Sequence, residues 1–247
     1  MKLRWSVAPM IVAAVALAGC DKAGSDNSAK PSAPVAAVAP PAGQQWTDIV
    51  AKTPQGGFIM GNPEAPVKLV EYASLTCPHC RDFTAAAAEP LRENYIKSGK
   101  VSWEFRPYVL NSLDVAATLL TRCQGPAPYF KLAEQVYADQ GAWIGRFQAL
   151  PEAEAQRIQA LPPEQQFRAL AGAAGLDGFF RARGLPQAKI DACLSDKAAL
   201  DEIVKIRDLG TNQDKITGTP SFLINGELQE SVYDWTLLEA KLREAVG

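Results

Sequence analysis

The pattern of hydrophobic and polar positions predicts a strand–helix–strand unit early in the folded part of the chain. Residues 67–72 form a short apolar run typical of a buried parallel strand, and residues 77–97 have a helical pattern that Ser98-Gly99 ends. Apolar and polar residues then alternate over residues 101–105, which predicts a second strand ended by Pro107. Together these segments make one βαβ unit.

A second unit with strands is predicted near the C-terminal end. Apolar residues 222–224 precede Asn225-Gly226, a strong signal for a two-residue hairpin turn, and residues 235–245 have the spacing of an amphipathic helix. Between the two units, over residues 112–213, apolar positions keep helical spacing with almost no strand pattern. The sequence therefore predicts an α/β fold of βαβ-ββα type with an inserted helical domain.

The first 45 residues are expected to lie outside the fold. A basic start and an apolar stretch over residues 7–18 end in Leu17-Ala18-Gly19-Cys20, which resembles a bacterial lipobox. This resemblance implies a signal peptide over residues 1–19, lipidation of Cys20, and retention at the inner membrane through Asp21. A soluble-secretion signal and an uncleaved anchor are the alternatives.

The next segment has the composition of a flexible tether. From Ala23 to Gly43, 16 of 21 residues are Ala, Pro, Ser or Gly, with no apolar periodicity. We expect a tether over residues 20–45, and a folded part over residues 46–111 and 214–247 that is interrupted by the helical insertion. Such a tether provides no N-terminal dimerisation domain.

Composition narrows the possible functions. The chain has 25 Lys and Arg against 27 Asp and Glu, a formal charge of −2, which argues against nucleic acid as a partner. It contains a single histidine, His79, and therefore no site that needs two imidazoles. That histidine lies within Cys77-Pro78-His79-Cys80, where the candidate chemistry is concentrated.

This Cys-Pro-His-Cys motif stands at the start of the first predicted helix. Cys77 faces the unpaired backbone N–H groups and the positive end of the helix dipole, both of which lower the pKa of a thiol. Cys80 lies on the same helical face, near enough to bond Cys77 and to attack a mixed disulfide formed there. Pro78 suits the first helical turn, and the His79 imidazole would stabilise the thiolate further. These features predict a redox-active dithiol.

Other interpretations of the motif remain at this point: half of a structural zinc site, an inert disulfide, or a thiol pair that holds copper(I). A distant loop favours thiol exchange. A cis Thr219-Pro220 bond just before a strand would expose backbone polar groups to an extended substrate. An ordinary trans-proline turn is the alternative there.

Taken together, these features resemble the DsbA-type thiol-disulfide oxidoreductases, which have a thioredoxin fold with a helical insertion. The resemblance covers roughly residues 46–247. It implies that Cys77 is the nucleophile, that Cys80 resolves, that His79 tunes the redox potential and that Pro220 is cis. It also implies that Glu71 is a buried carboxylate that moves protons at Cys80, whereas its alternative is a surface charge at a strand end. Thr219 departs from the archetypal oxidase, which has valine there, and agrees with isomerase and reductase relatives.

Cys123 and Cys193 are the remaining cysteines. Among the three possible pairings of four cysteines, the short spacing of the Cys-Pro-His-Cys motif favours Cys77-Cys80 together with Cys123-Cys193. The second pair would be a structural disulfide within the insertion, with two buried free thiols as the alternative.

The expected function is that of a monomeric, lipid-anchored periplasmic oxidase that passes its disulfide to newly exported proteins. The resemblance implies reoxidation by a quinone-linked membrane protein of the DsbB type, and neither cofactor nor metal is expected. Two alternatives remain: an isomerase or reductase kept reduced by a membrane electron donor, and a binding module that holds copper(I) or unfolded chains.

Overall fold

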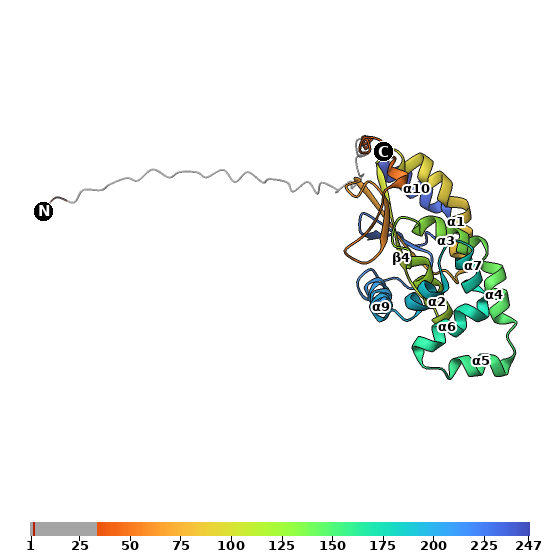
Figure 1. The fold of residues 1–247 in the computed structure, drawn as a ribbon. Coiled ribbons are helices and arrows are strands. Elements are labelled where there is room, and N and C mark those ends of the chain that lie inside the picture. Colours follow the sequence, from red (N-terminus) through yellow and green to blue (C-terminus); the bar gives the residue numbers. More distant parts are fainter. Residues whose placement is uncertain (1, 3–33) are drawn as a thin grey trace. The chain divides into compact units, whose positions relative to one another are not determined.

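The structure is a computed structural model that describes Lys2 and residues 34–247. Figure 1 shows a mixed β-sheet with helices on both faces and a further group of helices beyond one end of the sheet. The six strands are arranged in the order β1-β2-β4-β3-β5-β6. They span β1 (Val50–Lys52), β2 (Phe58–Gly61), β3 (Val67–Ala73), β4 (Val101–Pro107), β5 (Ser221–Ile224) and β6 (Glu227–Leu228).

The helical elements follow in chain order and are numbered as in Figure 1. They are η1 (Trp46–Asp48), α1 (Pro78–Leu91), η2 (Arg92–Ile96), α2 (Ser112–Arg122), α3 (Tyr129–Ala138), α4 (Gln140–Gln148), α5 (Glu152–Gln159), α6 (Pro163–Ala174), α7 (Leu176–Arg181), α8 (Gln187–Leu194), α9 (Lys197–Asn212) and α10 (Trp235–Val246). Within the described residues no helix has the length and apolar character needed to cross a bilayer.

The central pair of strands is parallel. β3 pairs with β4 in parallel, with Glu71 opposite Phe105, and with β5 in antiparallel fashion, with Glu71 opposite Phe222. Helix α1 connects β3 to β4, which confirms the predicted βαβ unit. The hairpin of β5 and β6 turns at Asn225 and Gly226, both at positive φ, and is followed by α10, which confirms the ββα unit.

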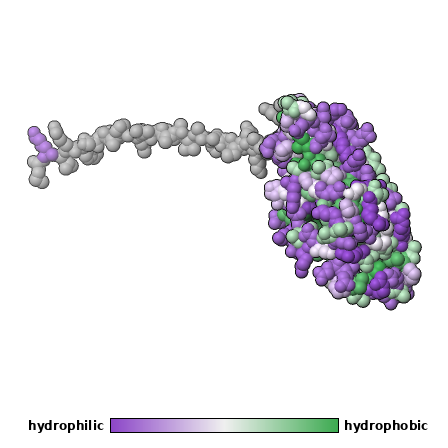
Figure 2. Space-filling view, viewed as in Figure 1, coloured by the Kyte–Doolittle hydropathy of each residue, from purple (hydrophilic) through white to green (hydrophobic). Residues whose placement is uncertain are grey.

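Side chains of β3 alternate between two hydrophobic cores. Leu69 and Ala73 face the larger core, which contains α1, α3 and α10, while Val70 and Tyr72 face a smaller core closed by α9. The larger core continues without interruption into helices α2–α8. The predicted α/β fold with a helical insertion is therefore present, and the described residues from 34 onward form one compact unit. The surface seen in Figure 2 is mostly polar, with smaller hydrophobic patches, one of them over the end formed by α4–α6.

Two features differ from the sequence predictions. The antiparallel pair β1 and β2 was not predicted, because its strands have only three and four residues. β2 pairs along the edge of β4, and Ser102 and Glu104 of β4 are buried, where the alternating pattern predicted a strand with one polar face.

Part of the predicted tether also lies on the fold. Val35 N–H donates to Val246 O, Val38 N–H donates to Ser98 O, and the Trp46 indole N–H donates to Val38 O at 2.7 Å. The docked stretch therefore starts at residue 34. Residues 20–33, including Cys20 with its predicted lipidation, lie outside the described residues, as do the predicted signal peptide cleavage site and Asp21.

Candidate active site

The cysteine pair lies where β3 leads into α1. Residues 74–76 form a short loop after the strand, Cys77 is the N-cap of α1 in an extended backbone conformation, and Pro78 occupies the first helical turn. Cys77 is 6% exposed and Cys80 is fully buried; both are free thiols in this structure. Pro78 and His79 are exposed to solvent. In this motif, Cys77 is therefore the more accessible cysteine, and Cys80 is shielded from solvent.

The pKa of Cys77 is lowered from 9.0 to about 5. The largest cause is hydrogen bonding from the Cys80 thiol; the Thr219 side chain and the backbone N–H groups of Cys80 and His79 add to it, and partial burial opposes it. His79 therefore acts here through its backbone at the start of the helix. The predicted contribution of its imidazole stays a prediction.

The pKa of Cys80 is shifted in the opposite direction. Its pKa is raised well above 9.0, first by burial, then by its hydrogen bond to Cys77 and by the negative charges at Cys77 and Glu71. The two sulfurs therefore differ in state: near neutral pH Cys77 is a thiolate and Cys80 a thiol. This asymmetry matches the predicted roles of a nucleophile and a resolving cysteine.

The loop before β5 closes the other side of the site. The Thr219-Pro220 peptide bond is cis, as predicted, and Pro220 is buried. Cys77 Sγ lies 3.2 Å from the Thr219 carbonyl oxygen, to which it donates only in the protonated thiol form. Residues 77 and 219, which are 142 positions apart, are thus brought into direct contact, and backbone polar groups stand beside the reactive sulfur.

Glu71 lies beneath the motif on β3 and is fully buried, so the alternative of a surface charge at a strand end is excluded. Its Oε2 accepts from the Trp103 indole N–H at 2.9 Å, and its Oε1 has no hydrogen-bond partner. Burial raises the pKa of Glu71 from 4.5 to about 8, although the Trp103 bond lowers it. A carboxyl group with such a pKa near Cys80 can take up and release a proton close to neutral pH.

Three site residues were not foreseen in the sequence. Asp114 of α2, Tyr137 of α3 and Gln140 of α4 all form hydrogen bonds to the loop that precedes Cys77. The sequence around Asp114 signals only the start of α2, where Asn111 caps the helix by accepting from the Asp114 N–H, and gives no sign of the contact with the loop. Tyr137 and Gln140 carry no local signal, because their contacts depend on how the insertion folds back onto the motif.

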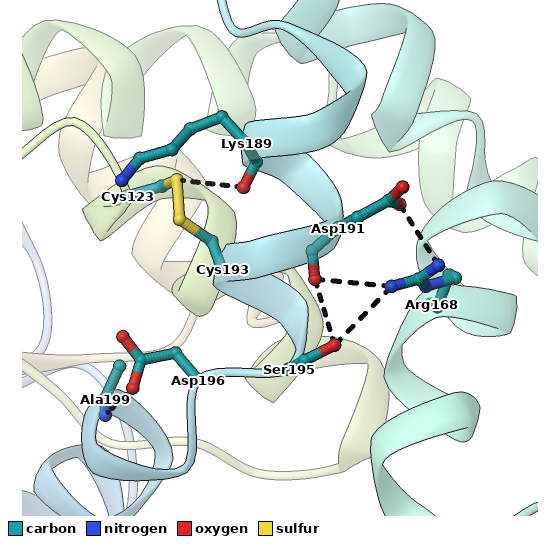
Figure 3. The surroundings of a disulfide bond; sticks show 8 residues. All are labelled: Cys123, Arg168, Lys189, Asp191, Cys193, Ser195, Asp196 and Ala199. Atoms are coloured by element: carbon teal, nitrogen blue, oxygen red, sulfur yellow. Dashed lines mark hydrogen bonds and ion pairs between the residues drawn. A yellow bond between two sulfur atoms is a disulfide. The ribbon is translucent and has the colours of Figure 1, made fainter.

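The outer cysteines are joined as predicted. Cys123 at the end of α2 and Cys193 in α8 form a disulfide with their Cα atoms 5.8 Å apart (Figure 3). Beside it, Arg168 of α6 forms an ion pair with Asp191 and reaches Ser195 (Figure 3). The disulfide lies within the insertion, and no three His, Cys, Asp or Glu side chains in the described part of the chain come together as a metal site.

Comparisons with known proteins agree with this geometry. The sequence profile of the thioredoxin family matches residues 53–244. A Rickettsia bellii protein assigned as a protein-disulfide oxidoreductase is 25% identical over 80% of this chain and 68% of its own length. A second one, from Rickettsia prowazekii, is 25% identical over 75% of this chain, which spans 60% of that relative.

Two solved structures are similar over most of their length. The protein-disulfide isomerase from Novosphingobium aromaticivorans is 32% identical, with a TM-score of 0.74, over 76% of this chain and 96% of that one. Wolbachia pipientis alpha-DsbA1 is 25% identical, with a TM-score of 0.60, over 79% and 92% of the two chains. With its thiolate and thiol beside a cis-proline loop, this chain belongs to the thioredoxin family and is a disulfide oxidoreductase of the DsbA type.

Proposed function

We propose that this protein is an oxidase that transfers the Cys77-Cys80 disulfide to pairs of cysteines in newly exported, unfolded chains. The observation that supports this direction is the low pKa of Cys77, about 5, next to the raised pKa of Cys80. A stable thiolate at Cys77 favours the reduced form of the enzyme. A disulfide whose reduced form is stabilised is a strong oxidant.

The first step is attack of a substrate thiolate on Cys77 Sγ of the oxidised enzyme. The Cys77-Cys80 bond breaks, a substrate–Cys77 disulfide forms, and Cys80 leaves as a thiolate that must gain a proton. Glu71 is suited to supply this proton, because its pKa of about 8 keeps the carboxyl group protonated near neutral pH. The raised pKa of Cys80 then holds that proton on sulfur.

In the second step, a second substrate thiolate attacks the substrate sulfur of the mixed disulfide. Cys77 leaves as a thiolate, which its low pKa favours, and the substrate gains one disulfide. Two electrons pass from the substrate dithiol to the enzyme. The enzyme is left with a Cys77 thiolate and a Cys80 thiol, and Glu71 regains its proton from solvent.

The substrate is proposed to bind as an extended segment at the Thr219-Pro220 loop. The Thr219 carbonyl oxygen lies at the reactive sulfur, so a substrate backbone beside it comes within reach of Cys77. Extended backbones pair with exposed strand-like edges largely without regard to side chains. Such binding suits a catalyst of many unrelated exported proteins.

We further propose that the protein works as a monomer in the periplasm, attached to the inner membrane through a lipid on Cys20. The support is the lipobox-like end of the apolar segment and the basic residues that precede it. The reduced enzyme would return to its disulfide form through a membrane oxidase of the DsbB type. The likeness to Wolbachia pipientis alpha-DsbA1 supports such a partner.

Disulfide isomerisation is the second candidate. The 32% identical structure from Novosphingobium aromaticivorans is described as a protein-disulfide isomerase, and Thr219 agrees with isomerase relatives. An isomerase must be held reduced, because its free thiolate opens wrong disulfides. The resting redox state of Cys77-Cys80 therefore separates the two functions.

The deciding experiment measures that state directly. Cells are quenched with acid, free thiols are alkylated, and the Cys77-Cys80 pair is scored by mass, with the Cys77→Ser variant as the control. A mostly oxidised pair is expected, together with rapid oxidation of a reduced two-cysteine peptide and poor rescue of a scrambled multi-disulfide protein. A mostly reduced pair with efficient rescue would overturn the oxidase proposal and favour the isomerase.

A further inference from the structure

The loop that precedes the nucleophile is held by side chains of the insertion. Asp114 Oδ1 accepts from the Leu75 N–H at 3.0 Å, and its Oδ2 accepts from the Ser74 hydroxyl at 2.5 Å. The Tyr137 hydroxyl donates to the Ser74 carbonyl oxygen at 3.0 Å. Residues from α2 and α3 thus fix the first half of the loop.

Gln140 fixes the second half. This side chain at the start of α4 is 2% exposed, and its Nε2 donates to the carbonyl oxygens of Leu75 at 2.8 Å and of Cys77 at 3.0 Å. The Cys77 carbonyl oxygen also accepts from the Arg81 N–H at 3.2 Å, as the first hydrogen bond of α1. One amide group therefore connects the loop to the carbonyl oxygen that begins the active-site helix.

We propose that Gln140 and Asp114 are positioning residues for the Cys77 nucleophile: they fix the backbone of residues 74–77 and so hold Sγ against the donors that face it. The insertion then has a role in the redox chemistry as well as in the fold. This inference rests on thiol–disulfide exchange at Cys77, in whichever direction the exchange runs in the cell.

The link to reactivity is geometric. Sγ is stabilised as a thiolate by the backbone N–H groups of His79 and Cys80, and these point at it only while Cys77 keeps its N-cap conformation. Without Gln140, the carbonyl oxygens of Leu75 and Cys77 each lose a donor, and the loop is held less tightly. The backbone N–H groups of His79 and Cys80 are then aligned with Sγ for a smaller fraction of the time. The thiolate loses part of its stabilisation, so the pKa of Cys77 rises.

Asp114 also interacts with Cys77 through charge. The charge at Cys77 contributes to raising the pKa of Asp114 to about 6, after burial as the largest cause, so the Asp114 carboxylate in turn disfavours the Cys77 thiolate. The other titratable groups that interact with Asp114 are the buried phenols Tyr129 and Tyr137. Because Cys77 titrates near pH 5, below the pKa of Asp114, the Asp114 carboxyl group is mostly protonated there. Replacing Asp114 by its amide keeps the size of the side chain and mainly removes the acceptor oxygen that holds Ser74.

The test compares two variants of the purified full chain in the reduced state, Gln140→Leu and Asp114→Asn, with Gln156→Leu as the matched control. Gln156 is an exposed glutamine of α5 that bonds only to Glu152. The pKa of Cys77 is measured by ultraviolet absorbance of the thiolate and by the pH dependence of alkylation. Thermal melting is recorded for the oxidised and reduced forms.

Gln140→Leu is expected to raise the Cys77 pKa by about one unit, or about tenfold in its acid constant, which corresponds to one lost hydrogen bond. Asp114→Asn is expected to raise it as well, because the loop loses an acceptor, and both variants melt below the wild type. Gln140→Asn, which keeps the amide but withdraws it from the loop, replaces Gln140→Leu if that variant does not fold. Unshifted titrations, or a Cys77 pKa that falls in either variant, would show that these residues only support the fold. Because the titration needs no substrate or cell, its outcome is independent of whether the oxidase proposal holds.

Discussion

Cys77 and Cys80 are three residues apart, yet their surroundings differ in kind. Cys77 stands at the edge of a helix start, where N–H groups have no partner within the helix. Cys80 is fully buried one turn later, above the carboxyl group of Glu71. The position of each sulfur relative to the helix start therefore determines which one is the nucleophile and which one is the resolving cysteine.

Replacement of single cysteines is expected to separate these roles. In Cys80→Ser the Cys77 thiolate can still open a disulfide of a cellular protein, and no second enzyme thiol is present to release that protein, so mixed disulfides accumulate. In Cys77→Ser the remaining thiol is buried and protonated, and no adducts are expected. Gel separation without reductant, followed by mass analysis, measures both. A larger yield of adducts in Cys77→Ser would reverse the assignment.

The second prediction concerns pH and Glu71→Gln. Burial raises the pKa of Glu71 from 4.5 to about 8, so between these pH values the folded protein keeps a proton that the unfolded chain has lost. The stability associated with the neutral carboxyl group is complete below pH 4.5 and is lost as the pH rises through 8. Relative to the wild type, Glu71→Gln should gain a few kcal/mol between pH 4.5 and 8, because each pKa unit corresponds to about 1.4 kcal/mol.

Denaturant unfolding of the oxidised protein measures this difference, since a disulfide removes the titration of Cys77, which has the opposite pH dependence. Glu227→Gln on the exposed edge of β6 serves as the control and should follow the wild type at every pH. A difference between Glu71→Gln and the wild type that does not change with pH would show that Glu71 is ionised in the folded protein.

Sequence patterns predict residues that act through local structure. The roles expected for Cys77, Cys80 and Pro220 follow from a helix start and from a proline before a strand, both readable over a few positions. Gln140 and Asp114 could not be predicted as parts of the site, because their partners are 63 and 39 residues away along the chain. For His79, the role of the imidazole stays a prediction, and the structure adds a contact of its backbone N–H with the Cys77 sulfur.

The elements that could be predicted are those long enough to show a complete hydrophobic period or those that end in a characteristic turn sequence. The seven-residue strands β3 and β4, the helix α1 and the hairpin turn at Asn225-Gly226 all have such a signal. The strands β1 and β2 are too short for an alternating pattern and exist because β2 pairs with the edge of β4. The predicted helix over residues 77–97 is interrupted: Pro90 lies inside α1, and the chain changes to the wider turn of η2 two residues later.

The third prediction concerns the disulfide that joins two helices of the insertion. The Cys123-Cys193 disulfide closes a segment with a sequence separation of 70, so on the chain-entropy model it stabilises the fold by about 4 kcal/mol. Replacing both cysteines by alanine should lower the melting temperature by roughly 10 °C. Peptide oxidation at a temperature below the new melting point should stay close to that of the wild type. Loss of oxidation without a change in melting would instead identify a second redox centre.

For the molecule as a whole, the docked N-terminal stretch gives the fourth prediction. Gly99 has φ +72°, and a Cβ there would lie 2.5 Å from Val38 O and 2.6 Å from Trp46 Nε1. Gly99→Ala should therefore displace residues 34–46 and cost about 2 kcal/mol, or roughly 5 °C in melting temperature. Hydrogen exchange at the Val35 and Val38 N–H groups should speed up, while Cys77 alkylation stays unchanged.

Gly184→Ala is the matched control for this experiment. Gly184 has φ +86° and open space around the added Cβ, so the variant has the same backbone strain without the contact. Equal melting temperatures for the two variants, with unchanged exchange at Val35 and Val38, would show that residues 34–46 contribute nothing to stability.

The docked N-terminal stretch and the reactive cysteine lie at opposite ends of the sheet. Val38 meets Ser98 beside the end of the sheet where β3 and β4 begin, whereas Cys77 follows the end where β3 finishes. A seven-residue strand separates these two ends by roughly 20 Å. Residues 34–46 therefore leave the end of the sheet that carries Cys77 uncovered, so changes in this stretch are not expected to alter thiol exchange.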